Sequence, residues 1–247
     1  SLFPVSCWIK IDETGNPDQN SYLYRLITKR DKMKITAPRI TAVLKEDVAL
    51  DEILLNDGED LTEFTFRNQR VFEIKTKNIS MQSCLFTNCM LIGCSIKKSQ
   101  FSDIIFRNCD LSNVNFSESG FHRVEFIDCK LIGVNFAESS LNHITFSNCK
   151  AEYINLTMSK LKYVGFNQCD LKSGSLESCQ FAYTVFDACN LKEAEFYRTS
   201  LKGTDLSNCD ISGIRISPIT GCELRGAAVT SLQALELAHL LGVTIKG

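Results

Sequence analysis

The sequence is poor in several features that define common classes of protein. Its 247 residues include only three His, four Pro and one Trp, and 27 Lys and Arg nearly balance 29 Asp and Glu. No run approaches the ~18 uncharged apolar residues of a membrane helix, and the start of the chain lacks a basic segment followed by an apolar one. A net charge of -2 argues against a strongly basic nucleic-acid-binding protein. We therefore expect a cytoplasmic globular protein with no membrane contact and no direct nucleic-acid contact.

The sequence also lacks the short motifs of common enzymes. His122, His143 and His239 are its only histidines, and it contains no Gly-rich phosphate loop, no H-E-x-x-H and no G-x-S-x-G. The sequence thus predicts no catalytic residues, no cofactor and no enzyme activity.

Phe and Cys are abundant by contrast, with 16 and 12 copies, and both follow one internal repeat. Every fifth residue from Leu61 to Ile216 is apolar, and Thr76 is the one exception. The residue two places earlier is almost always small or β-branched, and ten of the twelve Cys occupy such positions. A repeat of this kind is stronger evidence for the fold than the helix or strand propensity of any single segment.

A period of five fits neither an α-helix nor a flat strand, so the chain must turn a corner every five residues. Four such sides close a square coil of twenty residues, and successive coils stack as parallel strands about 4.8 Å apart. Two columns with a twenty-residue period support this interpretation. The first is a Cys column, preceded by amide residues able to form a ladder, and it consists of Cys89, Cys109, Cys129, Cys149, Cys169, Cys189 and Cys209. The second is a Phe column, which consists of Phe86, Phe106, Phe126, Phe146, Phe166 and Phe186.

The Cys residues admit three explanations. Cys84, Cys89 and Cys94 are spaced by five and fall on different walls, which does not suit a zinc site. Cys residues of successive coils in one column lie within disulfide reach. Their parallel, inward-pointing side chains and a reducing cytosol argue against disulfide bonds between them. We predict no metal and expect free thiols that fill the core.

This pattern resembles the pentapeptide-repeat family. The resemblance implies an all-β fold, a right-handed quadrilateral parallel β-helix over residues 61–229, with a short C-terminal α-helix. Ser217–Gly221 interrupt the repeat, and the apolar pattern resumes three residues out of phase.

The C-terminal segment, residues 230–247, carries the signals of a helix. Thr230 and Gln233 form a capping box, the helix extends through Leu241, and Gly242 is its C-cap. The helix is apolar on more than one side, so we expect one side to cap the coil and the other to join a second molecule. The predicted dimer interface is Leu232, Leu235, Leu237, Ala238, Leu240 and Leu241.

The same tail resembles that of the Qnr quinolone-resistance proteins of Gram-positive bacteria, through Gln233, Ala234, Leu237, Leu241 and Gly242. Further similar segments are Phe121–Val124, Cys149–Ala151, Phe166–Gln168, Thr199–Gly203 and Ser217–Pro218. The resemblance implies a tail-to-tail homodimer, shaped like duplex DNA, that binds DNA gyrase and topoisomerase IV and protects them from quinolones. Residues 61–229 hold 17 acidic and 18 basic residues, however, which makes a poor mimic of duplex charge. A generic protein-interaction scaffold is the alternative.

The N-terminal part shows no repeat. Met33–Thr36 resemble the start of the Gram-positive Qnr proteins, so residues 1–32 are either an upstream extension or a segment added to the natural chain. Residues 33–60 are predicted to form an N-terminal cap, mostly irregular, over the open first coil.

Two outward surfaces are candidates for partner binding. The first is a basic and aromatic stripe, formed by His122, Arg123, His143, Lys160, Lys162, Tyr163, Tyr183 and Lys202. Its best candidates are Arg123, His143, Lys162 and Tyr163, because Arg and Tyr often anchor interfaces. The second surface is an acidic wall with Glu118, Glu138, Glu177 and Glu195, of which Glu118 and Glu138 are the best candidates. For both surfaces a solvated face without a partner is the alternative.

Overall fold

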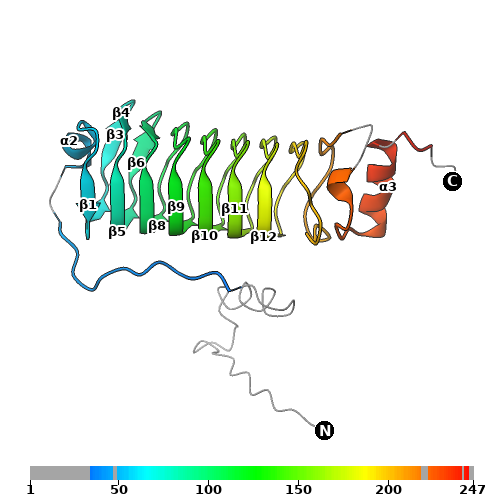
Figure 1. The fold of residues 1–247 in the computed structure, drawn as a ribbon, viewed down its shortest axis with the longest axis horizontal. Helices are drawn as coiled ribbons and strands as arrows, with labels where there is room; N and C mark the ends of the chain where they lie inside the picture. The colour runs from blue at the N-terminus through cyan, green and yellow to red at the C-terminus, as the bar shows by residue number, and fades with distance from the viewer. Residues whose placement is uncertain (1–33, 47–48, 218–221, 241, 245–247) are drawn as a thin grey trace, which may run out of the picture. The chain divides into compact units, whose positions relative to one another are not determined.

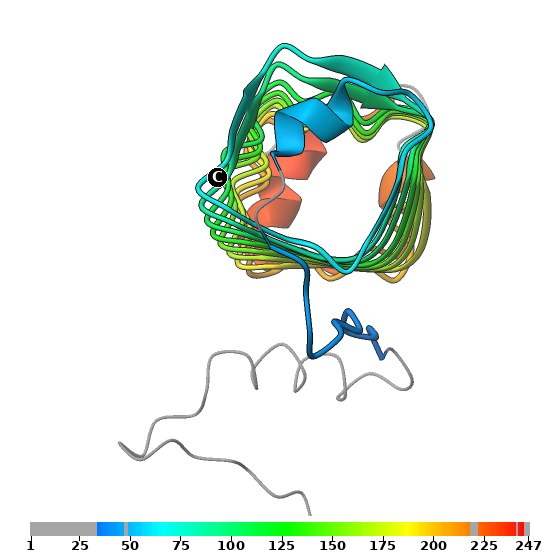
Figure 2. The ribbon, with the colours of Figure 1, turned by 90° about the vertical axis from the view of Figure 1, so that its left-hand side faces the viewer.

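The computed structural model describes residues 34–46, 49–217, 222–240 and 242–244. Residues Ile35–Gly247 form one compact unit. The predicted segment 1–32 lies outside the described residues. The unit is a four-sided parallel coil, visible end-on in Figure 2, and Figure 1 shows its strands side by side.

The main sheet confirms the twenty-residue coil. It runs in the order β1 (Asp60–Thr62), β5 (Ser80–Thr87), β8 (Gln100–Arg107), β9 (Gly120–Ile127), β10 (Ser140–Ser147), β11 (Lys160–Asn167) and β12 (Gln180–Asp187). β2 (Thr65–Arg67) also pairs with β5. Two small parallel pairs lie on other sides, β3 (Arg70–Phe72) with β6 (Met90–Ile92) and β4 (Lys75–Lys77) with β7 (Ser95–Lys97). Each residue pairs with the residue twenty positions later, as Phe146 does with Phe166.

The corners explain why the period is five. A positive φ recurs at every fifth residue from Glu63 to Arg198, with glycine at positions 93 and 133. This left-handed conformation turns the chain without a separate loop, and Asn and Asp tolerate it best. None of these corner residues is β-branched. At one corner the predicted amide ladder forms, since the Asn108 Nδ2 donates to the Asn88 Oδ1 at 2.8 Å and the Asn148 Nδ2 to the Asp128 Oδ1 at 2.7 Å.

The interior is filled by the predicted columns. The Phe rings stack along the coil axis with centroids 4.7 to 5.1 Å apart from Phe66 to Phe186. The eleven described Cys are free thiols, ten of them buried. Column thiols lie against main-chain carbonyls, as Cys149 Sγ lies 3.4 Å from the Phe126 oxygen. Thiols thus act as small, weakly polar fillers beside the carbonyls.

The N-terminal cap differs from the expected irregular cover. Residues 49–60 contain the short helix α2 (Leu50–Leu54), which lies across the open end of the coil in Figure 2 and buries Leu50 and Leu54 completely. Residues 35–46 do not cover that end. They form an extended segment, here called the strap, that runs along one corner of the coils and joins the first coil where Lys45 pairs with Phe64.

The C-terminal end follows the predicted phase change. Asp205 pairs with Ala228, twenty-three residues later, whereas earlier pairs are twenty residues apart. Residues 218–221 lie outside the described residues, and η1 (Cys222–Leu224) follows them. The helix α3 (Ser231–Leu240) begins at the predicted capping box, with the Gln233 N–H donating to the Thr230 Oγ1 and the Thr230 N–H to the Gln233 Oε1. In the part of the chain that the structure describes, no helix is long and apolar enough to cross a membrane.

Candidate protein-interaction surfaces

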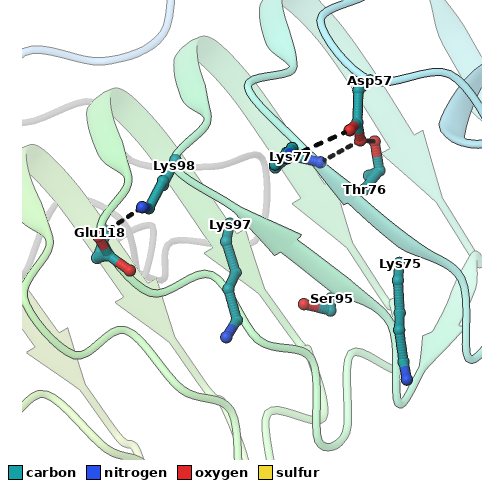
Figure 3. A pocket seen from close by; sticks show the side chains of 8 residues that line it. All are labelled: Asp57, Lys75, Thr76, Lys77, Ser95, Lys97, Lys98 and Glu118. Carbon is teal, nitrogen blue, oxygen red and sulfur yellow. Dashed lines mark hydrogen bonds and ion pairs between the residues drawn. The ribbon is translucent and has the colours of Figure 1, made fainter.

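A shallow groove of about 410 Å³ lies on the described surface (Figure 3). It is lined by Asp57, Lys75, Thr76, Lys77, Ser95, Lys97, Lys98 and Glu118. Asp57 forms an ion pair with Lys77 at 3.8 Å, and Glu118 forms one with Lys98 at 3.3 Å. Lys75 and Lys97 have no ion pair among the described residues, so the groove is basic on balance. Among the same residues no cluster of His, Cys, Asp or Glu has the geometry of a metal site.

The acidic wall is largely neutralised from coil to coil. Glu195 pairs with Arg215 at 2.7 Å, twenty residues on, and Glu177 pairs with Arg198. Glu118 is held by Lys98 in the same way. Glu138 is exposed and forms no ion pair among the described residues. Exposed pairs of this kind contribute little stability, but they remove the continuous negative potential that a duplex mimic needs.

The basic and aromatic stripe follows one corner column, and the structure divides it in two. The column consists of Glu63, Ser83, Asp103, Arg123, His143, Tyr163 and Tyr183, all with positive φ. Its first part is covered by the strap. The Thr41 N–H donates to the Ser83 Oγ at 3.0 Å, the Arg39 N–H to the Asp103 Oδ1 at 2.8 Å and the Thr36 N–H to the His143 Nδ1 at 3.0 Å.

Arg123 is therefore not a free anchor, which corrects its predicted role. Its guanidinium makes a bidentate pair with Asp103, with both distances 2.5 Å, and the two side chains are only 17% and 5% exposed. Burial raises the pKa of Asp103, but the hydrogen bonds from Arg123 and the Arg39 N–H outweigh it and hold that pKa below its ordinary value. Asp103 was not among the predicted site residues. Its position twenty residues before Arg123 was the available signal.

His143 has two roles at the boundary of the strap. It accepts from Thr36, and its ring stacks on Tyr163 with centroids 4.7 Å apart. Burial, followed by the nearby His122, Arg123 and Lys162, lowers the pKa of His143. His143 is therefore neutral near pH 7 and serves as an acceptor.

The remaining part of the stripe is open. Tyr163 stacks on Tyr183 with centroids 4.8 Å apart, and Tyr183 is 55% exposed. The Lys162 Nζ lies 5.6 Å from the centre of the Tyr163 ring. Of the predicted candidates, the structure thus brings His143, Lys162 and Tyr163 together, and Tyr183 extends the same group.

The exposed face of α3 is the third surface. Leu232, Leu235 and Leu240 are 77%, 49% and 38% exposed, and Ala238 is half-buried. Leu237 is only 7% exposed and packs into the core. It is therefore not available at the dimer interface, which corrects its predicted role. Leu241 lies outside the described residues. The Gln233 Nε2 attaches the helix to the coil, donating to the carbonyls of Leu206 and Cys209 at 2.9 and 2.8 Å.

Comparisons with known proteins agree with the repeat. Residues 119–174 match the model of the pentapeptide repeat region, and residues 99–137 and 175–213 match that of pentapeptide repeats in eight copies. No match is found among curated proteins.

Solved structures of similar proteins include QnrB1, a plasmid-mediated fluoroquinolone resistance protein. QnrB1 is 19% identical to this chain, with a TM-score of 0.33, and the match covers 76% of this chain and 99% of QnrB1. HetL, a pentapeptide repeat protein involved in heterocyst differentiation regulation in the cyanobacterium Nostoc, is 14% identical, with a TM-score of 0.27, over 69% and 89% of the two chains. Neither match bears on the functional proposal. The matched repeat models, together with a corner at every fifth residue, show that the chain belongs to the pentapeptide-repeat family.

Proposed function

We propose that this protein binds the type II topoisomerases DNA gyrase and topoisomerase IV as a homodimer and protects them from quinolones. It acts in the cytoplasm as a binding protein, without catalysis, and without direct contact to nucleic acid or membrane. The observation that carries the proposal is the C-terminal segment, where similarity to the Qnr proteins of Gram-positive bacteria coincides with an exposed apolar helix face.

The residues of that segment divide into two groups by contact. Gln233 and Leu237, which match the Qnr tail, attach α3 to the coil. Leu232, Leu235 and Leu240 stay exposed on the same helix. Leucines exposed to this extent at the end of a solenoid favour burial against a second copy, because the same patch can face itself across a two-fold axis.

The contact with a topoisomerase cannot depend on bulk charge. Residues 61–229 are nearly neutral, and the acidic wall is paired with cations from coil to coil. We therefore expect local patches to carry the contact, with a moderate rather than steep dependence on salt. The exposed Glu138 and the open part of the stripe are the two candidates.

A generic protein-interaction scaffold is the second candidate function. The near-neutral charge favours it, because the duplex-mimic account expects a strongly acidic surface. Under this alternative the dimer still forms, but its partner is not a topoisomerase.

A supercoiling assay separates the two functions. Purified gyrase acts on relaxed plasmid in the presence of ciprofloxacin, with and without the protein. We expect the protein to restore supercoiling at low concentration and to inhibit gyrase in excess. Failure to restore supercoiling, together with no binding to gyrase or topoisomerase IV, would establish the scaffold instead.

Charge-reversed variants locate the docking surface in the same assay. Glu118→Lys with Glu138→Lys tests the acidic wall, and Lys160→Glu with Lys162→Glu tests the open stripe. Arg123 is left unchanged, because its replacement would leave the buried Asp103 carboxylate without a positive charge beside it. We expect only one of the two double variants to weaken protection, and that variant identifies the docking surface.

A further inference from the structure

The parallel ladder stops at one place in the coil. On the wall of the stripe each coil begins with a bond to the coil before it, as the Lys160 N–H donates to the Ser139 carbonyl and the Gln180 N–H to the Ser159 carbonyl. No such bond forms at Ser200, and among the described residues no backbone hydrogen bond joins residues 180–183 to residues 200–203. β12 is accordingly the last strand of the main sheet in Figure 1.

Residues 200–203 keep their backbone bonds to the residues that follow them along the coil. The Leu201 N–H donates to the Glu223 carbonyl at 2.8 Å, and the Gly203 N–H to the Gly226 carbonyl at 2.9 Å. The two coils do stay in contact on both sides of this region. The Cys179 N–H donates to the Thr199 Oγ1 at 2.8 Å, and the Asn208 side chain donates to Asp187. A local opening, here called the seam, therefore separates residues 180–183 from residues 200–203.

One central residue at the seam is more exposed than its counterparts elsewhere in the coil. Every central residue of the repeat from Leu61 to Ile216 is buried except Phe181, which is half-buried. Ala182 and Tyr183 beside it are exposed. The corner of the next coil is Gly203, so the corner residue of that coil has no side chain that could stack on the Tyr183 ring.

The seam also has unsatisfied backbone donors. In the first coil the N–H of the corner residue Glu63 donates to the Gln82 carbonyl of the next coil at 3.0 Å. The equivalent donor in β12 is the N–H of Tyr183, which has no acceptor among the described residues. An open strand edge of this kind is a template for pairing with another extended chain.

The charge around the seam has one sign. Lys160, Lys162 and Lys202 are exposed there, and residues 160–163, 180–183 and 200–203 include no Asp or Glu. A partner with carboxylates is thus complementary to this wall. Nucleobases are less suitable, because rings stacked with centroids 4.7 and 4.8 Å apart leave no room for a base between them.

The strap shows that the same corner column accepts an extended chain. Three of its backbone N–H groups donate to side chains of Ser83, Asp103 and His143. Its contacts among the described residues end at His143, so Tyr163 and Tyr183 carry none of them. Within the described part of the chain, the column is therefore occupied over its first coils and open over its last.

We propose that the seam is the docking site for an extended acidic segment of a partner protein, which pairs with the edge of β12. Its backbone takes the place of the missing ladder bonds at Phe181 and Tyr183. Its carboxylates meet Lys160, Lys162 and Lys202, and an apolar residue of the segment covers the Tyr183 ring. The site does not require the partner to be a topoisomerase.

Fluorescence anisotropy with the full chain tests this site. The probe is a fluorescein-labelled peptide of alternating Glu and Val. Two matched peptides replace Glu by Gln or carry N-methyl groups on alternate amides, which block strand pairing. We expect each matched peptide to bind about tenfold more weakly than the probe, because each loses one of the two kinds of contact.

Variants locate the binding on the molecule. Lys160→Glu with Lys162→Glu should weaken binding of the probe by about tenfold. Lys75→Glu with Lys97→Glu makes the same change of charge on the groove of Figure 3 and should leave binding unchanged. Equal losses in both double variants, or equal binding of the N-methylated peptide, would overturn the site. The site would also be overturned if oligothymidylate bound and the probe did not, or if no peptide bound at ~1 mM.

Discussion

At the scale of single residues the coil makes two demands, a left-handed corner and an apolar centre. The corner conformation costs about 1–3 kcal/mol for most residues and is worst for β-branched ones. Asn relieves the cost by bonding to its neighbours, as Asn148 does through Asp128. The sequence predicts the amide ladder because Asn, Asp and Gln recur just before the Cys column, but it does not reveal which residues take a positive φ.

Asn148 is a direct test of the corner. Asn148→Val should lower the free energy of unfolding by about 1–3 kcal/mol, because Val is strained at the φ of +52° that this corner requires. Asn148→Gly is the matched control, since Gly adopts this conformation freely and loses only an exposed hydrogen bond. Urea denaturation of both variants checks the difference. Equal destabilisation would mean that the ladder, not the corner, dominates.

Phe146 tests the centre. Its ring lies between Phe126 and Phe166, with centroids 4.8 and 4.7 Å away, and is fully buried. Phe146→Ala should cost about 3–5 kcal/mol in unfolding free energy through lost burial and a residual cavity. The control Phe72→Ala removes a ring that is 55% exposed and should cost within about 0.5 kcal/mol. Near-wild-type melting of Phe146→Ala would contradict the stacked core.

At the scale of elements, the strap is held by hydrogen bonds to one corner column. Its donors are alternate or nearly alternate N–H groups, and Pro38, which has no N–H, falls between Thr36 and Arg39. The intervening corner residue is Arg123, which offers no acceptor. Donors and acceptors are thus matched along the strap.

Proline substitution distinguishes these donors. Arg39→Pro removes the N–H that donates to Asp103 and should speed hydrogen exchange at the Thr36 and Thr41 amides. Ile40→Pro is the control, because the Ile40 N–H donates to no group among the described residues. Exchange that is equally fast in both variants would show that the strap contacts are not maintained in solution.

The strap should also respond to acid. The native pKa of His143 is lowered, so the neutral ring contributes stability above its unfolded pKa of about 6.5, and this is lost as pH falls through the native pKa. Relative to the intrinsic exchange rate at each pH, the Thr36 amide should then be less protected at about pH 5 than at about pH 7.5, because a protonated Nδ1 cannot accept. Asp103 stays charged in this range, since its pKa is lowered as well. In His143→Gln, which accepts without titrating, the difference should disappear.

The sequence predicts the elements that carry a local signal, such as a period or a capping box, and misses those that do not. The period of five sets the coil, and the Thr230 and Gln233 capping box sets α3. The strap has no period, and its contacts join residues 42 to 107 positions apart, which no local pattern encodes. For the same reason the sequence assigns Arg123 to a free surface, although Asp103 and the strap enclose it.

At the scale of the whole molecule, the two ends of the coil are closed in different ways. α2 buries both of its large leucines over the first coil, whereas α3 buries Leu237 and leaves three other leucines exposed. The first arrangement completes a monomer. The second leaves apolar area that a second copy can cover, so the predicted dimer belongs at the α3 end.

A double substitution on α3 tests the dimer without disturbing the coil. Leu232→Asp with Leu235→Asp changes two side chains that are 77% and 49% exposed, so melting should stay near that of the wild type. In the proposed dimer interface the same two charges would be buried without partners, and the variant should be monomeric by light scattering at concentrations where the wild type is dimeric. Leu237→Asp is the contrasting variant, because it places a charge in the core and should lower the melting temperature directly. A double variant that stays dimeric would move the interface away from α3, and a monomeric wild type would leave the exposed leucines without this role. Loss of quinolone protection in the monomeric but folded double variant would tie the dimer to the proposed function, because two copies are needed to contact both halves of a two-fold enzyme.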